Sequence, residues 1–381
     1  MNRIIFLLLI SNAIFGMQPA ESFYNSAQIL AVINKTVIEM NSNCPAPQNL
    51  PLSPETKSCP RAHQGLYNEL VACQECTDEH VKITFPHVIY GYDPENSVIK
   101  NSFWASKKDL TPLNELNANL KSHIPHADYA HTPTIVLIYP WKNFSLGTRF
   151  THVPSHDNCH SYAIAKIDYN QQSIALDFVP HENAIIEIRQ STQERKKLFA
   201  SLINNLIDRV TASGKANIIP YVWGGSSFIE PYTDGNFYQS AGAWHRDCTN
   251  NPYSGYDCSE LVMRIAQIAG IDFPWKTSTA IQRALTEICP EDSIQNGDLI
   301  WVPGHVMIIS NSEKNELIEA RGYSSGYGCV HRITLDECFA DITTYDDLRT
   351  HFKNGTPIQF KDRNGNVLEK KHPVQILKLA D

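Results

Sequence analysis

The chain has 381 residues, of which 42% are hydrophobic, and its formal net charge is −8 at pH 7. This length predicts two to three domains, and the hydrophobic fraction is ordinary for a globular protein. The acidic balance and the absence of a basic block argue against a nucleic-acid partner.

The first twenty residues have the pattern of a secretory signal peptide. A short basic region, Asn2-Arg3, precedes an apolar run over residues 4–14, and the small residues Gly16 and Ala20 follow. The apolar run is short for a membrane span, and no second segment is long enough to cross a bilayer. We therefore expect export to the periplasm or the cell exterior, with no integral membrane segment in the mature protein.

Residues 21–80 are expected to form a helical and clip-like segment. Apolar residues recur at helical spacing over 23–42, a short helix is expected at 66–71, and residues 43–60 are rich in Pro, Ser and Cys, which is typical of an extended clip. Four of the ten cysteines fall in this segment, and in an exported chain they favour disulfides over a zinc or redox site. These are Cys44, Cys59, Cys73 and Cys76.

Short β-like runs dominate residues 81–190 and predict small barrels, because several brief strands alternate with turns. The expected strands are 81–85, 88–92, 134–139, 150–153, 161–167, 173–178 and 184–188. A connecting helix is then expected within 191–215, where apolar residues line one face from Ser191 to Ser213 and Gly214 ends the pattern.

A further helix is expected directly after Asp257. The stretch from 257 to 269 has apolar residues at helical spacing and is followed by Gly270, a common helix stop. Cys258 falls in the first turn, where backbone N–H groups lack partners within the helix and the helix dipole favours negative charge. A thiolate is therefore stabilised there, and the thiolate is the nucleophile in cysteine chemistry. The alternative is a small buried Cys on an ordinary core helix.

Two later stretches favour the catalytic interpretation. Residues 297–310 predict two apolar strands joined at a Pro-Gly turn, with His305 at the start of the second, and residues 316–320 predict a third strand. A hairpin in an even register places Glu319 beside His305 on one face. The order Cys258, His305, Glu319 then follows the logic of a nucleophile, a base and a residue that orients the base.

Five motifs in one order resemble the NlpC-type cysteine peptidases of bacterial cell-wall metabolism. They are Tyr221-Val222-Trp223-Gly224-Gly225, Tyr256-Asp257-Cys258-Ser259, Gly297-Asp298-Leu299, Gly304-His305-Val306 and Ile318-Glu319-Ala320. The resemblance implies a circularly permuted papain-like fold over about residues 216–345. It also implies cleavage of peptidoglycan stem peptides, usually between D-glutamate and the diamino acid. No cofactor and no metal are expected.

The resemblance also suggests substrate contacts and neighbouring modules. The residues expected to bind substrate are Tyr221, Asp257, Ser259, Thr277 and Ser278. Tyr221 is in addition a plausible donor to the oxyanion. Residues 141–150 resemble the bacterial SH3-like domains that often precede NlpC-type catalytic domains.

The expected fold is therefore α+β. A permuted papain-like catalytic domain follows one or two SH3-like β-barrel modules and an N-terminal helical and clip segment. The expected parts are a signal peptide (1–20), the helical and clip segment (21–80), the SH3-like modules (81–190), the connecting helix (191–215), the catalytic domain (216–345) and a C-terminal extension (346–381).

Several positions depart from the family pattern. Glu260 stands where Gly usually follows Asp-Cys-Ser, and we expect it on the solvated side of the helix. Glu319 replaces the more frequent His, Asn or Gln, and its carboxylate favours the imidazolium form of His305. The usual Pro-Arg motif becomes Pro274-Trp275-Lys276. The connection over 226–256 is longer than usual and is expected either to wall the cleft or to be decoration.

The sequence thus predicts an exported cysteine endopeptidase that acts on peptidoglycan or on free muropeptides. If an SH3-like module covers the cleft, Asp257 pairs with the free amine of an N-terminal L-alanine and selects stems already released from glycan. Two alternatives remain open: an acyltransferase or deamidase of the same fold that acts on proteins, and a non-catalytic cell-wall-binding protein. The presence of Cys258, His305 and Glu319 argues against the non-catalytic alternative.

Overall fold

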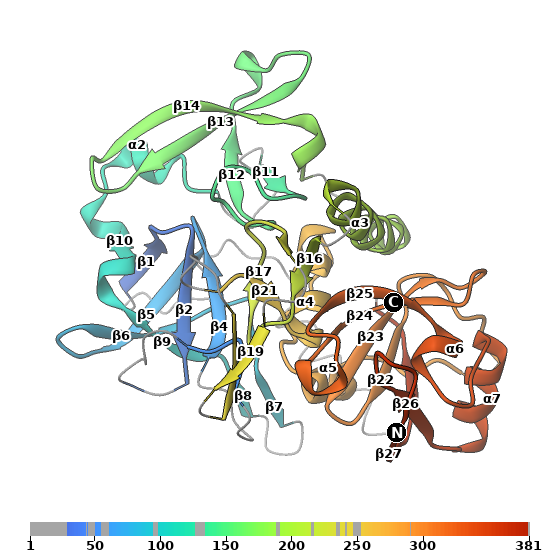
Figure 1. Ribbon diagram of the computed structural model, residues 1–381. Coiled ribbons are helices and arrows are strands. Elements are labelled where there is room, and N and C mark those ends of the chain that lie inside the picture. Colours follow the sequence, from blue (N-terminus) through green and yellow to red (C-terminus); the bar gives the residue numbers. More distant parts are fainter. Residues whose placement is uncertain are drawn as a thin grey trace, which may run out of the picture.

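The structure is a computed structural model that describes residues 29–42, 44, 50–54, 61–93, 98–125, 134–187, 191–214, 217–233, 237–240, 242–246, 253–289 and 291–379. The signal peptide expected at 1–20 lies outside these residues. Two β-sheets from the front half of the chain and one from the rear half lie around the central helix α4 (Cys258–Ile268), as Figure 1 shows. No helix within the described ranges combines the length and hydrophobicity needed to cross a bilayer.

The first sheet has seven antiparallel strands in the order β10-β1-β5-β6-β9-β2-β4. They are β1 (Ile29–Ile33), β2 (Val37–Asn41), β4 (Arg61–Leu66), β5 (Leu70–Cys76), β6 (His80–Thr84), β9 (Ser102–Ser106) and β10 (Leu110–Pro112). Because β5 pairs with β6, the domain boundary expected at residue 80 would cut through this sheet. The N-terminal segment is therefore part of the first β module.

The two helices expected in this segment are wrong. From residue 29 onward the stretch predicted as a helix forms β1 and β2, joined by the polar turn Asn34-Lys35. Its many β-branched residues suit a pleated surface, and strand pairing on both sides overrides the helical spacing. The helix expected at 66–71 is the tight turn between β4 and β5, where Asn68 adopts a φ of 70°.

The second sheet is five-stranded and antiparallel, in the order β14-β13-β12-β11-β15. Its strands are β11 (Thr134–Leu137), β12 (Arg149–His152), β13 (Ser161–Asp168), β14 (Ser173–Pro180) and β15 (Ala184–Ile186), and the short helix α2 (Ala118–Lys121) precedes them. They coincide with the runs expected between 131 and 190. Tyr67 from the β4–β5 turn packs against Phe144 and Phe150, so the two front sheets share a core.

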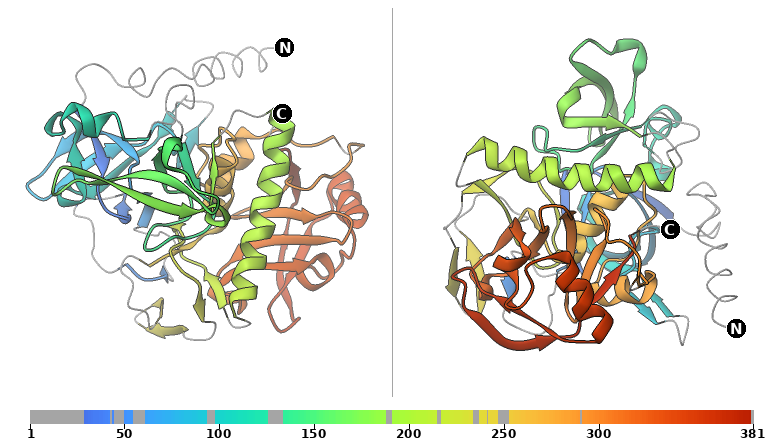
Figure 2. Two further views of the ribbon diagram at one scale, coloured as in Figure 1. Left: turned by 90° about the horizontal axis from the view of Figure 1, so that it is seen from above. Right: turned by 90° about the vertical axis from the view of Figure 1, so that its right-hand side faces the viewer.

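Helix α3 (Thr192–Ser213) is the predicted connecting helix. Ser191 caps it, and Glu194 completes a capping box with the Ser191 backbone and side chain. Its buried residues, including Phe199, Ile203 and Leu206, pack on α4 and on the rear sheet, along which the helix runs (Figure 2). The helix is therefore an integral layer of the rear domain.

The rear sheet has seven strands in the order β18-β16-β25-β24-β23-β22-β28. They are β16 (Asn217–Pro220), β18 (Tyr232–Thr233), β22 (Leu299–Val302), β23 (His305–Asn311), β24 (Glu316–Arg321), β25 (Cys329–Thr334) and β28 (Gln375–Leu377). Its second face packs on α6 (Leu335–Cys338), α7 (Tyr345–Asn354) and the hairpin of β26 (Ile358–Lys361) and β27 (Val367–His372). Because β28 pairs with β22, the expected C-terminal extension completes this sheet.

The long 226–256 connection contains two strand pairs. Strand β17 (Ser226–Ser227) pairs with β21 (Gly255–Tyr256), and β19 (Phe237–Ser240) pairs with β20 (Ala243–Arg246). Strand β20 also pairs with β3 (Ser53–Pro54) of the front half. The connection therefore ties the two halves together.

Buried polar contacts hold the front half against the catalytic helix. Arg264 on α4 is 1% exposed and forms an ion pair of 2.7 Å with Glu69. The Gln64 side chain donates to the Tyr253 carbonyl at 2.6 Å and accepts from the Ser227 hydroxyl at 2.8 Å. The hairpin of β7 (Gly91–Asp93) and β8 (Val98–Lys100) lies next to α5 (Ser278–Ala284). The front half is therefore docked on the catalytic helix.

Candidate active site

Cys258 is the first residue of α4, at the helix end where the sequence places it. Asp257 is the N-cap: its Oδ1 accepts from the backbone N–H groups of Ser259 at 3.0 Å and Glu260 at 2.8 Å, and its Oδ2 accepts from Gly224 N–H at 2.9 Å. Gly224 has a φ of 72°, and a Cβ there would collide with the Arg61 carbonyl. The glycine motif and the first turn of α4 therefore position each other.

His305 begins β23 directly after the Pro303-Gly304 turn, and its Nε2 lies 2.6 Å from Glu319 Oε2. The register that pairs Ile308 with Ile318 puts Glu319 on the same face as His305. Cys258 is 9% exposed and the His305 side chain 19%, so both lie in a mostly desolvated site. The structure thus brings Cys258, His305 and Glu319 together.

Electrostatics at this site favour the imidazolium form of His305. Burial lowers the pKa of His305, but the charge and hydrogen bond of Cys258 and those of Glu319 outweigh burial and raise the pKa to about 10. Burial raises the pKa of Glu319, yet contacts with His305 and His331 and the charge of Arg321 hold this pKa well below its usual range. The arrangement can therefore supply a thiolate nucleophile and a proton donor beside it.

Two further side chains, Arg321 and His331, lie beside Glu319, and the sequence analysis did not identify them. Arg321 Nη1 lies 3.4 Å from Glu319 Oε1. His331 Nε2 lies 3.2 Å from the same oxygen, but this second contact does not have the geometry of a hydrogen bond. His331 is directly opposite Glu319 in the β24–β25 register and stacks on Tyr327 with ring centroids 4.2 Å apart. The alternation of side chains along the strand shows which residues share a face with Glu319. It identifies His331 only once the pairing of β24 with β25 is known.

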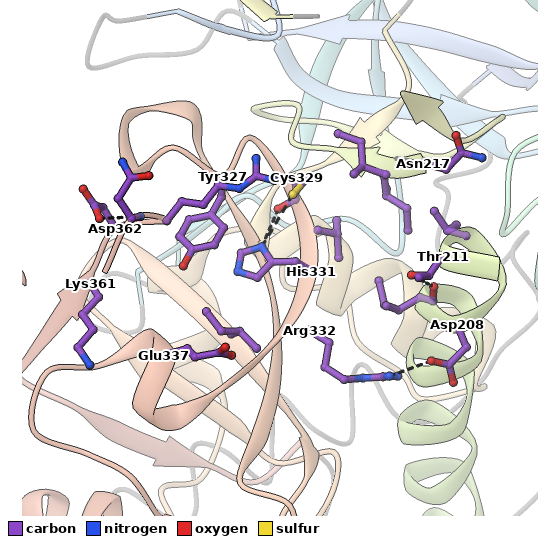
Figure 3. A pocket seen from close by; sticks show the side chains of 18 of the residues that line it. Asp208, Thr211, Asn217, Tyr327, Cys329, His331, Arg332, Glu337, Lys361 and Asp362 are labelled. Atoms are coloured by element: carbon purple, nitrogen blue, oxygen red, sulfur yellow. Dashed lines mark hydrogen bonds and ion pairs between the residues drawn. The ribbon is translucent and has the colours of Figure 1, made fainter. Parts of the chain in front are cut away.

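A groove of about 1360 Å³ lies between His331 on the rear sheet and the end of α3 (Figure 3). The end of α3, strands β16 and β25, α6 and the β26–β27 turn form its walls. Arg332 crosses it to an ion pair of 2.8 Å with Asp208. Cys258 and His305 do not line this groove, whereas His331 does and also contacts Glu319. His331 therefore links the groove to Glu319.

The five expected substrate-binding residues lie in three places. Asp257 and Ser259 flank Cys258, and the Ser259 hydroxyl donates to Asp257 Oδ1 at 3.0 Å. Thr277 caps α5 by accepting from Ala280 N–H, and the Ser278 carbonyl accepts from Trp301 Nε1 at 2.8 Å. These contacts are helix caps and backbone anchors.

Tyr221 occupies the third place, next to the strand that leads into Asp257. It forms a β-bridge with Tyr256 and makes an edge-on contact with Tyr323, with ring centroids 6.1 Å apart. Tyr323 also stacks on Trp244 of β20, with centroids 5.2 Å apart. The inserted hairpin therefore packs beside the aromatic group that contains Tyr221.

Glu260 corrects an expectation, because it is buried and not solvated. Its Oε1 lies 2.5 Å from Lys276 Nζ and 3.0 Å from His63 Nδ1, and its side chain is 0% exposed. Burial raises the pKa of Glu260, but Lys276 and His63 outweigh burial and lower it below its usual value. The helix face that the sequence suggested was solvated is covered by the front half of the chain.

Within the described ranges, no group of three His, Cys, Asp or Glu side chains is arranged to hold a metal ion. Cys44, Cys73 and Cys76 are free thiols, whereas the sequence favoured disulfides for them. Cys59 and Cys248 lie outside the described residues.

Comparisons with known proteins place the rear domain in a family. Residues 219–328 match the NlpC/P60 family, and no curated protein matches the chain. The solved structure of an NlpC/P60 family protein from Bacillus cereus ATCC 10987 aligns over 84% of this chain and 96% of that chain, with 14% identity and a TM-score of 0.51. It shows a shared fold over both halves of the chain.

Two other solved structures are more distant. NlpC2 from Trichomonas vaginalis aligns over 93% of this chain and 100% of that chain, with 12% identity and a TM-score of 0.33. The peptidoglycan hydrolase RipB from Mycobacterium tuberculosis aligns over 51% and 69%, with 18% identity and a TM-score of 0.26. Cys258, His305 and Glu319 all fall inside the segment that matches the family. The chain therefore carries an NlpC/P60 family domain at residues 219–328.

Proposed function

We propose that this protein is an exported cysteine endopeptidase that hydrolyses peptidoglycan stem peptides at the bond between D-glutamate and the diamino acid. The observation that carries the proposal is the contact of His305 with both Cys258 and Glu319 inside the NlpC/P60 domain. NlpC/P60 proteins are cysteine peptidases, and this cluster contains the groups that such chemistry requires.

In the proposed mechanism, the Cys258 thiolate attacks the amide carbonyl, and the carbonyl electron pair moves to oxygen. Collapse of this intermediate breaks the C–N bond while the His305 imidazolium gives its proton to the leaving amine. Neutral His305 then takes a proton from water as the water attacks the thioester. Release of the acid restores the thiolate and the imidazolium. Glu319 orients His305 throughout and stabilises its charged form.

The oxyanion is assigned to the start of α4. The backbone N–H groups of Ser259 and Glu260 already donate to Asp257, so we assign the Cys258 N–H to the oxyanion, with the Tyr221 hydroxyl as a second donor. Ser259, Thr277 and Ser278 are proposed to contact the stem peptide.

We further propose that Asp257 reads the free amine of an N-terminal L-alanine. Oδ1 accepts three bonds from the chain, whereas Oδ2 accepts one from Gly224, so Oδ2 has capacity for another donor. A docked front half supports this idea, because it fixes the space next to the first turn of α4. We propose that its β modules are SH3-like and that the catalytic domain is a permuted papain-like fold.

The test uses purified full-length protein with free and N-acetylated stem peptides and with intact peptidoglycan. We expect cleavage of the free peptide with kcat/KM at least about 30-fold higher than for the acetylated peptide, because an unpaired buried charge typically costs about 2–5 kcal/mol. Mass spectrometry identifies the bond. Equal rates would refute the recognition of a free amine and leave a wall-remodelling endopeptidase. Glutamine mass shifts on proteins without stem cleavage would indicate a deamidase or transglutaminase, and binding without turnover would indicate a wall-binding protein.

A further inference from the structure

A buried charge cluster connects the first turn of α4 with the front half of the chain. Glu260 Oε1 lies 2.5 Å from Lys276 Nζ and 3.0 Å from His63 Nδ1. The side chains of His63 and Glu260 are 0% exposed and that of Lys276 is 7% exposed, so water screens these charges little. Glu260 Oε2 and His63 Nε2 are buried without a hydrogen-bond partner. The ion pair with Lys276 and the contact with His63 therefore offset the burial of Glu260.

The front half positions both partners of Glu260. His63 belongs to β4, where its ring packs edge-on against Phe85 with centroids 5.5 Å apart. The backbone around Lys276 pairs with Ile89 of the front half in a parallel β-bridge. The Lys276 N–H donates to the Ile89 carbonyl at 2.9 Å, and the Ile89 N–H donates to the Pro274 carbonyl at 2.7 Å. Removing the front half would therefore remove His63 and release the segment that carries Lys276.

The cluster matters for the nucleophile because two carboxylates, Asp257 and Glu260, lie in the same helix turn as Cys258. Asp257 precedes Cys258, and Glu260 follows two residues later. Burial raises the pKa of Asp257, Lys276 lowers it and Glu260 raises it, so Lys276 acts on both carboxylates. The other charged group on this face of α4, Arg264, is paired with Glu69. Without Lys276, a thiolate at Cys258 would form beside two carboxylates, and His305 on β23 would be the cationic partner left to it.

We propose that Lys276 and His63 are positioning residues for the nucleophile, which hold Glu260 in a paired state beside Cys258 and so make the reactivity of Cys258 depend on docking of the front half. This inference deepens the proposed function and relies on it only for the role of Cys258. It also explains how this chain accommodates a carboxylate at a position where its family usually has glycine.

The test measures alkylation of Cys258 by iodoacetamide with mass spectrometry, in full-length protein, from pH 5 to 9. It needs no substrate, so it remains informative if the proposed function fails. Lys276→Met should slow alkylation at pH 6.5 by at least about tenfold and move the rate–pH curve to higher pH. Glu260→Gln should react at least as fast as the wild type. The double variant Glu260→Gln/Lys276→Met should return to within about threefold of the wild type.

A matched control is Lys82→Met, which breaks an exposed ion pair of 2.7 Å with Glu75 far from this cluster. It should leave alkylation unchanged. If Lys276→Met does not fold, the same comparison is made with His63→Leu and with the double variant His63→Leu/Glu260→Gln. We expect slower alkylation in His63→Leu and recovery of the rate in the double variant. Wild-type alkylation in Lys276→Met and His63→Leu, or a double variant as slow as its slow parent, overturns the proposal.

Discussion

Glu319→Gln replaces the carboxylate that lies 2.6 Å from His305 with an uncharged amide of the same shape. The pKa of His305 rises from 6.5 to about 10, which corresponds to about 5 kcal/mol in favour of the imidazolium. Cys258 and Glu319 together supply this preference against the effect of burial. Because the contributions of Cys258 are larger than those of Glu319, we assign about 2 kcal/mol to Glu319, and losing that amount lowers the rate by about 30-fold.

The assay is kcat/KM for a free stem peptide between pH 5 and 11. In the wild type the imidazolium persists up to about pH 10, so activity should decline only as pH rises through that value. Glu319→Gln should lower the maximum by the stated factor and move the alkaline limb to lower pH. Glu319→Ala should be worse, because it also removes the group that holds the ring in place.

Glu316→Gln is the matched control, because Glu316 begins the same strand but makes no contact with His305. It should retain wild-type activity and the same alkaline limb. The reasoning is refuted if Glu319→Gln keeps kcat/KM within about threefold of the wild type and its alkaline limb does not move. The residue that orients His305 would then have to be sought elsewhere.

Four further outcomes follow from the structure. Cys258→Ala and Cys258→Ser should abolish stem cleavage and keep the circular dichroism spectrum, and ordinary turnover in either would contradict the mechanism. Because the pKa of His305 is raised, its contribution to stability is complete below about pH 6.5 and is lost as pH rises through about 10. A difference in stability between the wild type and Cys258→Ser that does not change with pH would contradict this account. His331→Ala should lower kcat several-fold with little change in KM, whereas His331→Gln should recover most of it by donating to the same oxygen, and equal losses in both would indicate a purely structural role. Arg264→Met leaves Glu69 without its ion-pair partner and should reduce the free energy of unfolding in urea by about 3–5 kcal/mol, and a loss below about 1 kcal/mol would show that the docking contacts are dispensable.

Local chemistry was enough to predict the elements that carry the cluster. Asp257 before Cys258 predicts a capped helix start, and the structure shows that cap. Gly270, with a φ of 74°, ends the helix region as expected. The Pro303-Gly304 turn and the period-2 alternation along β23 and β24 predict which side chains share a face. These features depend on residues close together in the chain, so the sequence alone contains them.

Other features depend on contacts between distant segments. Glu260 is buried because His63, 197 residues away in the chain, packs against it, and no spacing around Cys258 predicts that. Residues 29–41 are strands because four other strands pair with them, although their apolar spacing also fits a helix. His331 meets Glu319 only through the register of two strands. Propensity and periodicity act over a few residues, whereas burial and ion pairing are decided by which surfaces meet, and only the tertiary structure determines that.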